Sequence, residues 1–111
     1  MVHSEKLISE VEAASESGAR NLHTPDCVIS PQTYNAALHA VGSVIEGAVE
    51  VAERRFDNAF CAVRPPGHHA ENDYAMGFCF FNNIALVAEF LTKKMGFKRV
   101  LIFDFDVHHG N

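Results

Sequence analysis

Residues 99–111 read RVLIFDFDVHHGN, and this stretch decides the fold. After one arginine, residues 100–103 form a continuous apolar run, which is typical of a strand covered on both faces. Residues 59–63 (AFCAV) form a similar run that stops at the sequence Pro65-Pro66-Gly67, as a buried strand does when it enters a loop. The sequence therefore predicts two buried strands, each followed by a loop rich in polar residues.

Three other stretches show the three-and-four spacing of apolar residues that marks one face of a helix. The strongest covers residues 30–55, where Ser30 is predicted to cap the helix and Pro31 to be its first residue. Another runs from about residue 81 to residue 95, between the two predicted strands. A weaker pattern covers residues 4–14. These stretches are predicted to be helices.

The resulting order ends in a strand, a helix and a second strand, which usually close as a right-handed crossover with parallel strands. The predicted fold class is therefore α/β, with central strands flanked by helices. Two parallel strands alone leave both sheet edges open. We therefore expect these residues to be part of a larger parallel sheet, incomplete at both ends, or to form a homo-oligomer that covers the exposed edges.

The composition excludes several classes of protein. The chain has 111 residues, of which 48% are hydrophobic and 21% charged, so it is predicted to form one compact unit with a core. Its net charge of −5 argues against direct nucleic-acid binding and against attraction to anionic membranes. Because its three cysteines form no C-x-x-C pair and its start carries no signal-like apolar run, a cytoplasmic location, or a nuclear one in a eukaryote, is expected.

The seven histidines include two adjacent pairs, His68–His69 and His108–His109. Each pair follows one of the predicted strands. Because ligand sites of open α/β sheets lie beyond the carboxyl ends of the strands, the two pairs are expected to converge. A single histidine at such a place is more often a structural polar residue, but two pairs at two strand ends favour a functional site.

Alternation along the second stretch places Asp104, Asp106 and His108 on one face, because successive side chains of an extended chain point to opposite sides. Asp106 and His108 are candidate ligands of a divalent metal such as zinc, whose third protein ligand is not visible. Since His68 and His69 lie on a loop bounded by proline and glycine, they are better suited to proton transfer. Asp104 is expected to accept a hydrogen bond from one of these imidazoles.

Other conspicuous residues are assigned to packing on spacing alone. The aromatic cluster near residue 80 and the three cysteines are predicted to be buried hydrophobic residues. They are Phe78, Phe80, Phe81, Cys27, Cys61 and Cys79.

Three segments together resemble the zinc-dependent histone deacetylase family, in its class II-like branch with bacterial deacetylases and acetylpolyamine amidohydrolases. They are residues 64–70 (RPPGHHA), 77–83 (GFCFFNN) and 104–111 (DFDVHHGN). The resemblance implies the arginase–deacetylase fold and hydrolysis of acetyl-lysine or acetylpolyamine amides. It also implies that residues 1–111 are an N-terminal portion of the catalytic domain, without its first strand and C-terminal part, and inactive when isolated.

The resemblance also implies roles for individual residues. It makes Asp106 and His108 zinc ligands, His69 the general base and acid, and His68 an electrostatic neighbour that is paired with Asp104. It further implies a structural potassium ion, bound by Asp104 and by the backbone carbonyl groups of Asp106 and His108. A third zinc ligand and a transition-state tyrosine would lie outside these residues.

The remaining implied site residues concern the substrate and the second histidine. Asn111 would stand behind His69, at a position where asparagine marks the class II-like branch. Gly77 and Phe78 would line the tunnel for the acyl-lysine chain, which conflicts with the packing role that spacing suggests for Phe78. Asp26 would match a rim aspartate that grips the substrate backbone.

Two other classes remain open from the sequence. Residues 100–106 also resemble the nucleophile strand of haloacid-dehalogenase-type phosphatases, in which Asp104 would attack phosphorus and Asp106 would act with magnesium. This interpretation leaves the His68–His69 pair unexplained. A non-enzymatic assembly or binding module, with its open sheet edges covered by a second copy, is the third interpretation.

Overall fold

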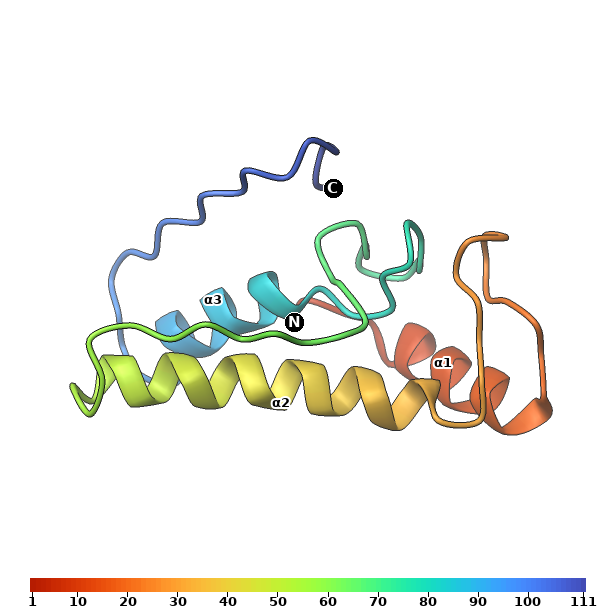
Figure 1. Ribbon diagram of the computed structural model, residues 1–111, viewed down its shortest axis with the longest axis horizontal. Coiled ribbons are helices and arrows are strands. Elements are labelled where there is room, and N and C mark those ends of the chain that lie inside the picture. Colours follow the sequence, from red (N-terminus) through yellow and green to blue (C-terminus); the bar gives the residue numbers. More distant parts are fainter.

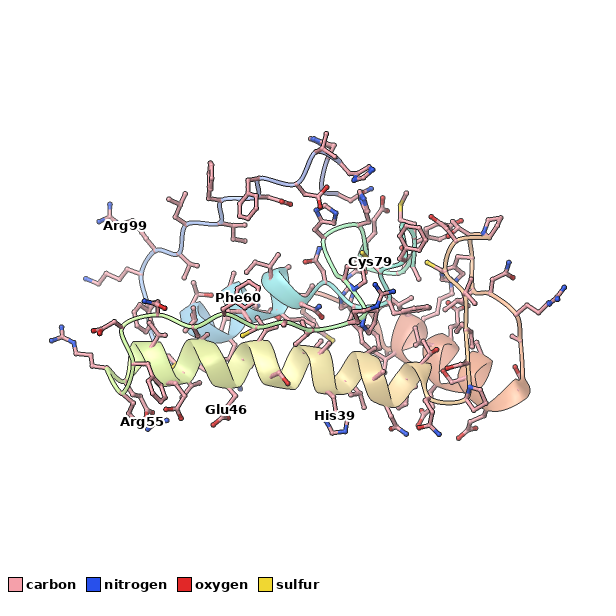
Figure 2. All side chains as sticks on the ribbon, in the orientation of Figure 1. His39, Glu46, Arg55, Phe60, Cys79 and Arg99 are labelled. Carbon is pink, nitrogen blue, oxygen red and sulfur yellow. The ribbon has the colours of Figure 1, made fainter.

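The computed structural model describes residues 1–111 and contains three helices joined by long extended segments (Figure 1). Helix α1 spans Glu5–Ser17, α2 spans Thr33–Ala52 and α3 spans Asn83–Lys93. Helix α2 is the central element, since both α3 and α1 pack against it. Figure 2 shows His39 and Glu46 projecting from α2 on the side away from α3.

The weakest of the three predicted helices, α1, is present and extends beyond its predicted end at residue 14. The Ser4 hydroxyl caps it by accepting a hydrogen bond from the Leu7 amide, and Gly18 ends it in the left-handed conformation with φ 72°. Leu7 and Val11 are completely buried on its inner face.

The strongest predicted helix, α2, starts later than predicted. It begins at Thr33, so the prediction of Ser30 as its cap and Pro31 as its first residue is wrong. The reason is a turn before the helix, in which the Thr33 amide donates to the Ser30 carbonyl at 3.0 Å and the Thr33 hydroxyl accepts from the Ser30 amide at 2.8 Å. The helix ends at Ala52 rather than at residue 55.

Helix α3 lies within the predicted range 81–95, with tighter bounds. The side chain of Asn82 caps it by accepting a hydrogen bond from the Ala85 amide at 3.1 Å. After its last residue, Gly96 adopts φ 76°, and the Phe97 amide donates to the Leu91 carbonyl at 3.0 Å. The C-cap of the helix is Lys94, so this left-handed glycine follows the cap by two residues and turns the chain away from the helix.

The two predicted strands are extended but unpaired, so the predicted pairing of strands does not occur within these residues. Figure 1 shows residues 57–64 and 98–106 running in the same direction, well apart from each other. Residues 98–110 make no backbone–backbone hydrogen bond, and residues 57–64 make only a local one, from the Val63 amide to the Cys61 carbonyl. Neither segment reaches the hydrogen-bonding edge of the other, and a strand forms only where two such edges meet.

The core lies between α1, the first half of α2 and the loop before α3. Its buried hydrophobic residues are Leu7, Val11, Cys27, Ile29, Ala37, Ala75, Phe80 and Phe81. All three cysteines are free thiols. Cys27 and Cys79 are buried, as predicted, whereas Cys61 is half-buried. No helix has both the length and the apolar character that crossing a membrane requires.

An apolar face on the last segment lies outside this core. Leu101, Phe103, Phe105 and Val107, here called the apolar stripe, alternate along the chain and are 81–94% exposed. Their alternation puts them on one side of the segment. The predicted burial of this segment on both faces is therefore wrong for these 111 residues, because nothing within them covers the stripe.

Candidate active site

The loop that carries the two histidines, residues 64–70, is fixed to the start of α3. The Asn82 side chain donates to the Ala70 carbonyl and the Asn83 side chain donates to the Pro65 carbonyl, each at 3.2 Å. Gly67 passes so close to the backbone of Asn83 that an added Cβ would overlap it. The loop is thus held at both of its ends and needs glycine in its middle.

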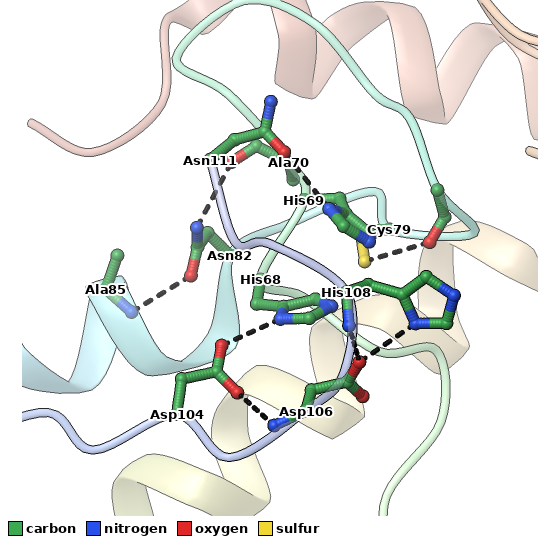
Figure 3. A network of polar contacts seen from close by, with 11 residues as sticks. His68, His69, Ala70, Cys79, Asn82, Ala85, Asp104, Asp106, His108 and Asn111 are labelled. Atoms are coloured by element: carbon green, nitrogen blue, oxygen red, sulfur yellow. Dashed lines mark hydrogen bonds and ion pairs between the residues drawn. The ribbon is translucent and has the colours of Figure 1, made fainter.

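The two adjacent imidazoles point at two different partners on the last segment (Figure 3). The ring centroids of His68 and His69 are 4.1 Å apart. His68 Nδ1 lies 2.8 Å from Asp104 Oδ2, and His69 Nδ1 lies 3.0 Å from Asn111 Oδ1. The two segments therefore converge, as their places after two extended runs predict, and Asp104 is the partner of one imidazole.

The chain beside His69 turns sharply through two left-handed residues. Gly77 has φ 57° and lies against the His69 ring, which an added Cβ would overlap. Phe78 has φ 64° and is 59% exposed, so the prediction from spacing that it packs inside is wrong. Phe80 and Phe81 are buried as predicted. The left-handed turn is the physical reason, since it directs Phe78 away from the core that its neighbours enter.

Asp104 and the two candidate metal ligands are linked by hydrogen bonds, each from a backbone amide to the carboxylate two residues earlier in the sequence. Asp104 Oδ1 accepts from the Asp106 amide at 3.0 Å, and Asp106 Oδ1 accepts from the His108 amide at 2.8 Å. Asp104, Asp106 and His108 line one pocket together with His68. Phe105 and Val107, the residues between them, are 88% and 94% exposed. The predicted alternation of side chains along this stretch is thus present.

Both carboxyl groups on this segment are biased toward the ionised form. The hydrogen bond from His68 is the main reason that the pKa of Asp104 lies below its usual value. For Asp106, the amide and then the imidazole of His108 lower the pKa. Because both pKa values lie below an already acidic reference, both groups are anionic at neutral pH.

Asp106 and His108 offer the carboxylate oxygen and imidazole nitrogen that zinc binds in proteins. Asp106 Oδ1 and His108 Nδ1 are 2.9 Å apart, close enough to approach one ion, and both side chains are largely exposed. The two side chains fit a zinc ion whose further protein ligand comes from outside residues 1–111. Nowhere do the 111 residues gather three or more histidine, cysteine or acidic side chains suited to one metal ion.

The residues predicted to touch substrate fall into a different pocket. Asp26 and Phe78 line one pocket together with Arg64 and Pro65. That pocket includes neither histidine of the pair and neither candidate metal ligand. His68, Asp106 and His108 line another pocket. The two predicted groups adjoin at the turn at Gly77, which lies against the His69 ring, and at Arg64 and Pro65, which belong to the histidine loop and line the second pocket.

Sequence reasoning missed two residues that contact this site, Glu71 and His3. Asn111 Nδ2 donates to Glu71 Oε1 at 3.0 Å. His3 Nδ1 donates to the Glu71 carbonyl at 2.8 Å, from the opposite end of the chain. The only signal for Glu71 is its position two residues after His69, and the sequence carries none for His3 beyond its being a histidine near the start.

Comparisons with known proteins agree with one family. The family model described as "Histone deacetylase domain" matches residues 1–111. Histone deacetylase 5 of Arabidopsis thaliana is 57% identical over 79 residues, which cover 68% of this chain and 12% of that protein. Histone deacetylase 18 of the same plant is 41% identical over 120 residues, which cover 100% of this chain and 18% of that protein. Histone deacetylase 9 of Homo sapiens is 55% identical over 76 residues, which cover 68% of this chain and 8% of that protein.

A solved structure matches the whole chain in three dimensions. The crystal structure of the HDA15 HD domain superposes with a TM-score of 0.91 and 39% sequence identity. The match covers 100% of this chain and 31% of that one. The 111 residues therefore span less than a third of the solved chain and less than a fifth of the curated relatives given above.

Proposed function

Because this chain belongs to the histone deacetylase family and adopts part of the arginase–deacetylase fold, we propose that it carries the proton-transfer half of a zinc-dependent deacetylase site. The proposed substrate is the acetyl-lysine side chain of a protein, with an acetylated polyamine as the small-molecule counterpart. One observation carries the proposal. Two adjacent imidazoles are each held through Nδ1 by a separate side chain, Asp104 or Asn111.

His69 is the proposed general base and acid. Its Nδ1 faces the carbonyl oxygen of Asn111, which can only accept a hydrogen bond, so the proton sits on Nδ1 and the lone pair on Nε2 is free. His68 is the proposed electrostatic neighbour, because its Nδ1 lies 2.8 Å from the Asp104 carboxylate. General acid–base catalysis of this kind contributes on the order of 10²–10⁴ in rate.

Asp106 and His108 are the proposed zinc ligands within this chain, with a further ligand from outside these residues. When bound, zinc polarises the acetyl carbonyl group and lowers the pKa of bound water to about 7. Two ligands alone bind weakly, so we expect the isolated 111 residues to be inactive. The structural potassium ion at Asp104 stays a prediction from the resemblance.

Gly77, Phe78 and Asp26 are the proposed substrate contacts. Gly77 brings the backbone against the ring of His69, which supports a place for the acyl-lysine chain beside this imidazole. Phe78 presents an exposed aromatic ring next to that glycine. Asp26 lines the same pocket as Phe78 and can accept hydrogen bonds from backbone amides of a peptide.

A chimera tests this function. Residues 1–111 would replace the matching part of the HDA15 HD domain, and hydrolysis of an acetyl-lysine reporter would be measured with and without a chelator. We expect chelator-sensitive hydrolysis, a loss of about 10²–10⁴-fold in kcat for His69→Ala, and no change for His39→Ala, which lies exposed on the outer side of α2. A folded, zinc-loaded chimera that does not hydrolyse the reporter would contradict the proposal.

An assembly module is the second candidate function. The observation that favours it is the apolar stripe together with two unpaired extended segments, since exposed strand edges and apolar patches are common association surfaces. A homo-oligomer would cover them. The mass in solution by light scattering distinguishes the two, because a monomer that unfolds sharply would argue against self-association. The phosphatase interpretation is wrong, since the whole chain matches the deacetylase family.

A further inference from the structure

The Asn111 side chain is held from two sides. Its Oδ1 accepts from His69 Nδ1 at 3.0 Å, while its Nδ2 donates to Glu71 Oε1 at 3.0 Å and lies 3.5 Å from Met76 Sδ. The Asn111 backbone amide also donates to the His68 carbonyl at 3.0 Å. The residue thus fastens the end of the last segment to the histidine loop.

Glu71 decides which end of the Asn111 amide faces His69. An ionised carboxylate only accepts hydrogen bonds, so it attracts the amide nitrogen and repels the amide oxygen. A half-turn of the Asn111 amide would place its oxygen against Glu71 and its NH₂ group against His69 Nδ1. His69 would then have to accept at Nδ1, and its proton would move to Nε2.

We propose that Glu71 is a positioning residue for His69, because its carboxylate holds the Asn111 amide in the orientation that keeps the proton on His69 Nδ1. The consequence for catalysis rests on the proposed function, since only a general base needs the free lone pair on Nε2. The orienting effect itself does not depend on catalysis.

The neighbouring imidazole shows why such a residue is needed on one side only. His68 faces the carboxylate of Asp104. Both oxygens of a carboxylate accept hydrogen bonds, so the His68 ring meets an acceptor in either orientation of the carboxylate. Asn111 has one accepting atom and one donating group, so a second partner must choose between its two orientations. Glu71 is that partner.

The backbone of Glu71 is itself fixed, which keeps its carboxylate in reach. The Glu71 amide donates to the Tyr74 carbonyl at 2.9 Å, and the Glu71 carbonyl accepts from His3 Nδ1 at 2.8 Å. His3 is 3% exposed, and its Nε2 accepts from the Asn82 amide at 2.8 Å. Because burial lowers the pKa of His3, the ring is neutral at pH 7 with its one proton directed at Glu71.

The proposal is tested by measuring the tautomer of His69 in the 111-residue chain labelled with ¹⁵N. Long-range ¹H–¹⁵N spectra at pH 8.5, where an ordinary imidazole is neutral, report which ring nitrogen carries the proton. We expect the Nδ1–H form to dominate in the wild-type chain. Glu71→Ala should lower the ratio of Nδ1–H to Nε2–H by about tenfold, the size expected for one lost hydrogen bond to a charged group. Glu71→Gln, which keeps an accepting oxygen, should retain most of the ratio.

Two controls separate positioning from a general loss of structure. Asp73→Ala removes a negative charge from the same exposed loop, at a side chain without a hydrogen bond, and should leave His69 unchanged. His68 should keep its tautomer in Glu71→Ala, because its partner is Asp104. A backbone amide spectrum that matches the wild type establishes that each variant is folded.

A rescue variant makes the test decisive. Asn111→Asp in the Glu71→Ala background supplies a carboxylate that accepts from His69 in either orientation, so the Nδ1–H form should return without Glu71. An unchanged tautomer in Glu71→Ala, or no recovery in the double variant, would overturn the proposal. The position of the His69 ring proton is measured without any catalytic assay. An inactive chimera would therefore contradict the proposed function and leave the proposed role of Glu71 unaffected.

Discussion

The candidate site is assembled from two regions that are held in place very differently. The histidine loop and the turn after it, residues 64–83, contain buried residues and are tied to the N-terminal segment and to α3. The last segment, residues 98–111, has one backbone–backbone hydrogen bond, from the Asn111 amide to the His68 carbonyl. Residues 64–83 contribute to the core, whereas residues 98–111 cross the surface of the molecule.

This difference separates the two halves of the proposed chemistry. The proton-transfer half lies on the loop, whose position is determined by buried hydrogen bonds within these 111 residues. The metal half lies on the last segment, which is tied to the loop through exposed side chains such as Asp104. Exposed ion pairs contribute little stability, so the loop should resist perturbations that the segment does not.

Among changes near the candidate site, replacing His3 should have the largest effect on stability, because it removes the brace of the loop. His3→Ala leaves the Asn82 amide and the Glu71 carbonyl without their buried partner, and we expect the free energy of unfolding to fall by about 2–4 kcal/mol. Urea unfolding measures this. His39→Ala, an exposed histidine on α2, is the matched control and should change it by less than about 0.5 kcal/mol. Equal losses in both variants would contradict the proposed bracing.

A smaller effect of the same residue should appear on acidification. Burial lowers the pKa of His3 in the folded chain below its value of 6.5 in the unfolded chain. As the pH falls through 6.5, the unfolded state takes up the proton first, so the free energy of unfolding decreases until the pH passes the folded pKa.

The measurement is the urea midpoint of unfolding at pH 7.5 and at pH 5.5. We expect the midpoint of the wild-type chain to drop more than that of His3→Gln, in which the titrating group is gone. The other six histidines are common to both proteins, so the difference between the two decreases in the urea midpoint measures the contribution of His3. A drop of the same size in both would show that other groups cause the acid sensitivity.

The sequence was sufficient for features that depend on local pattern. The helices follow from the spacing of apolar residues, although the start of α2 was misplaced because a turn at Ser30 competes with the cap. The alternation of Asp104, Asp106 and His108 follows from the extended backbone alone. The convergence of the two histidine-bearing segments follows from the general position of sites in α/β folds.

Features that depend on distant partners could not be predicted in the same way. Strand pairing depends on which chain lies at the neighbouring edge, and no residue of this chain occupies the edges of residues 59–63 and 99–103. The contact between Glu71 and Asn111 joins residues 40 positions apart and has no periodic signal. The exposure of Phe78 depends on two left-handed residues, of which only Gly77 is suggested by residue type.

The smallest effect on the free energy of unfolding is expected on the last segment. Comparing a leucine-to-alanine substitution in the core with the same substitution in this segment measures it. Leu7→Ala, in the core, should cost about 2–5 kcal/mol, since Leu7 is completely buried. Leu101→Ala, in the apolar stripe, should change the free energy of unfolding by less than about 0.5 kcal/mol, because Leu101 is 91% exposed and buries almost nothing on folding. A loss above about 1 kcal/mol at Leu101 could come only from burial of the stripe in solution. If that loss also depended on protein concentration, a second copy would be the cover and the assembly function would gain over the catalytic one.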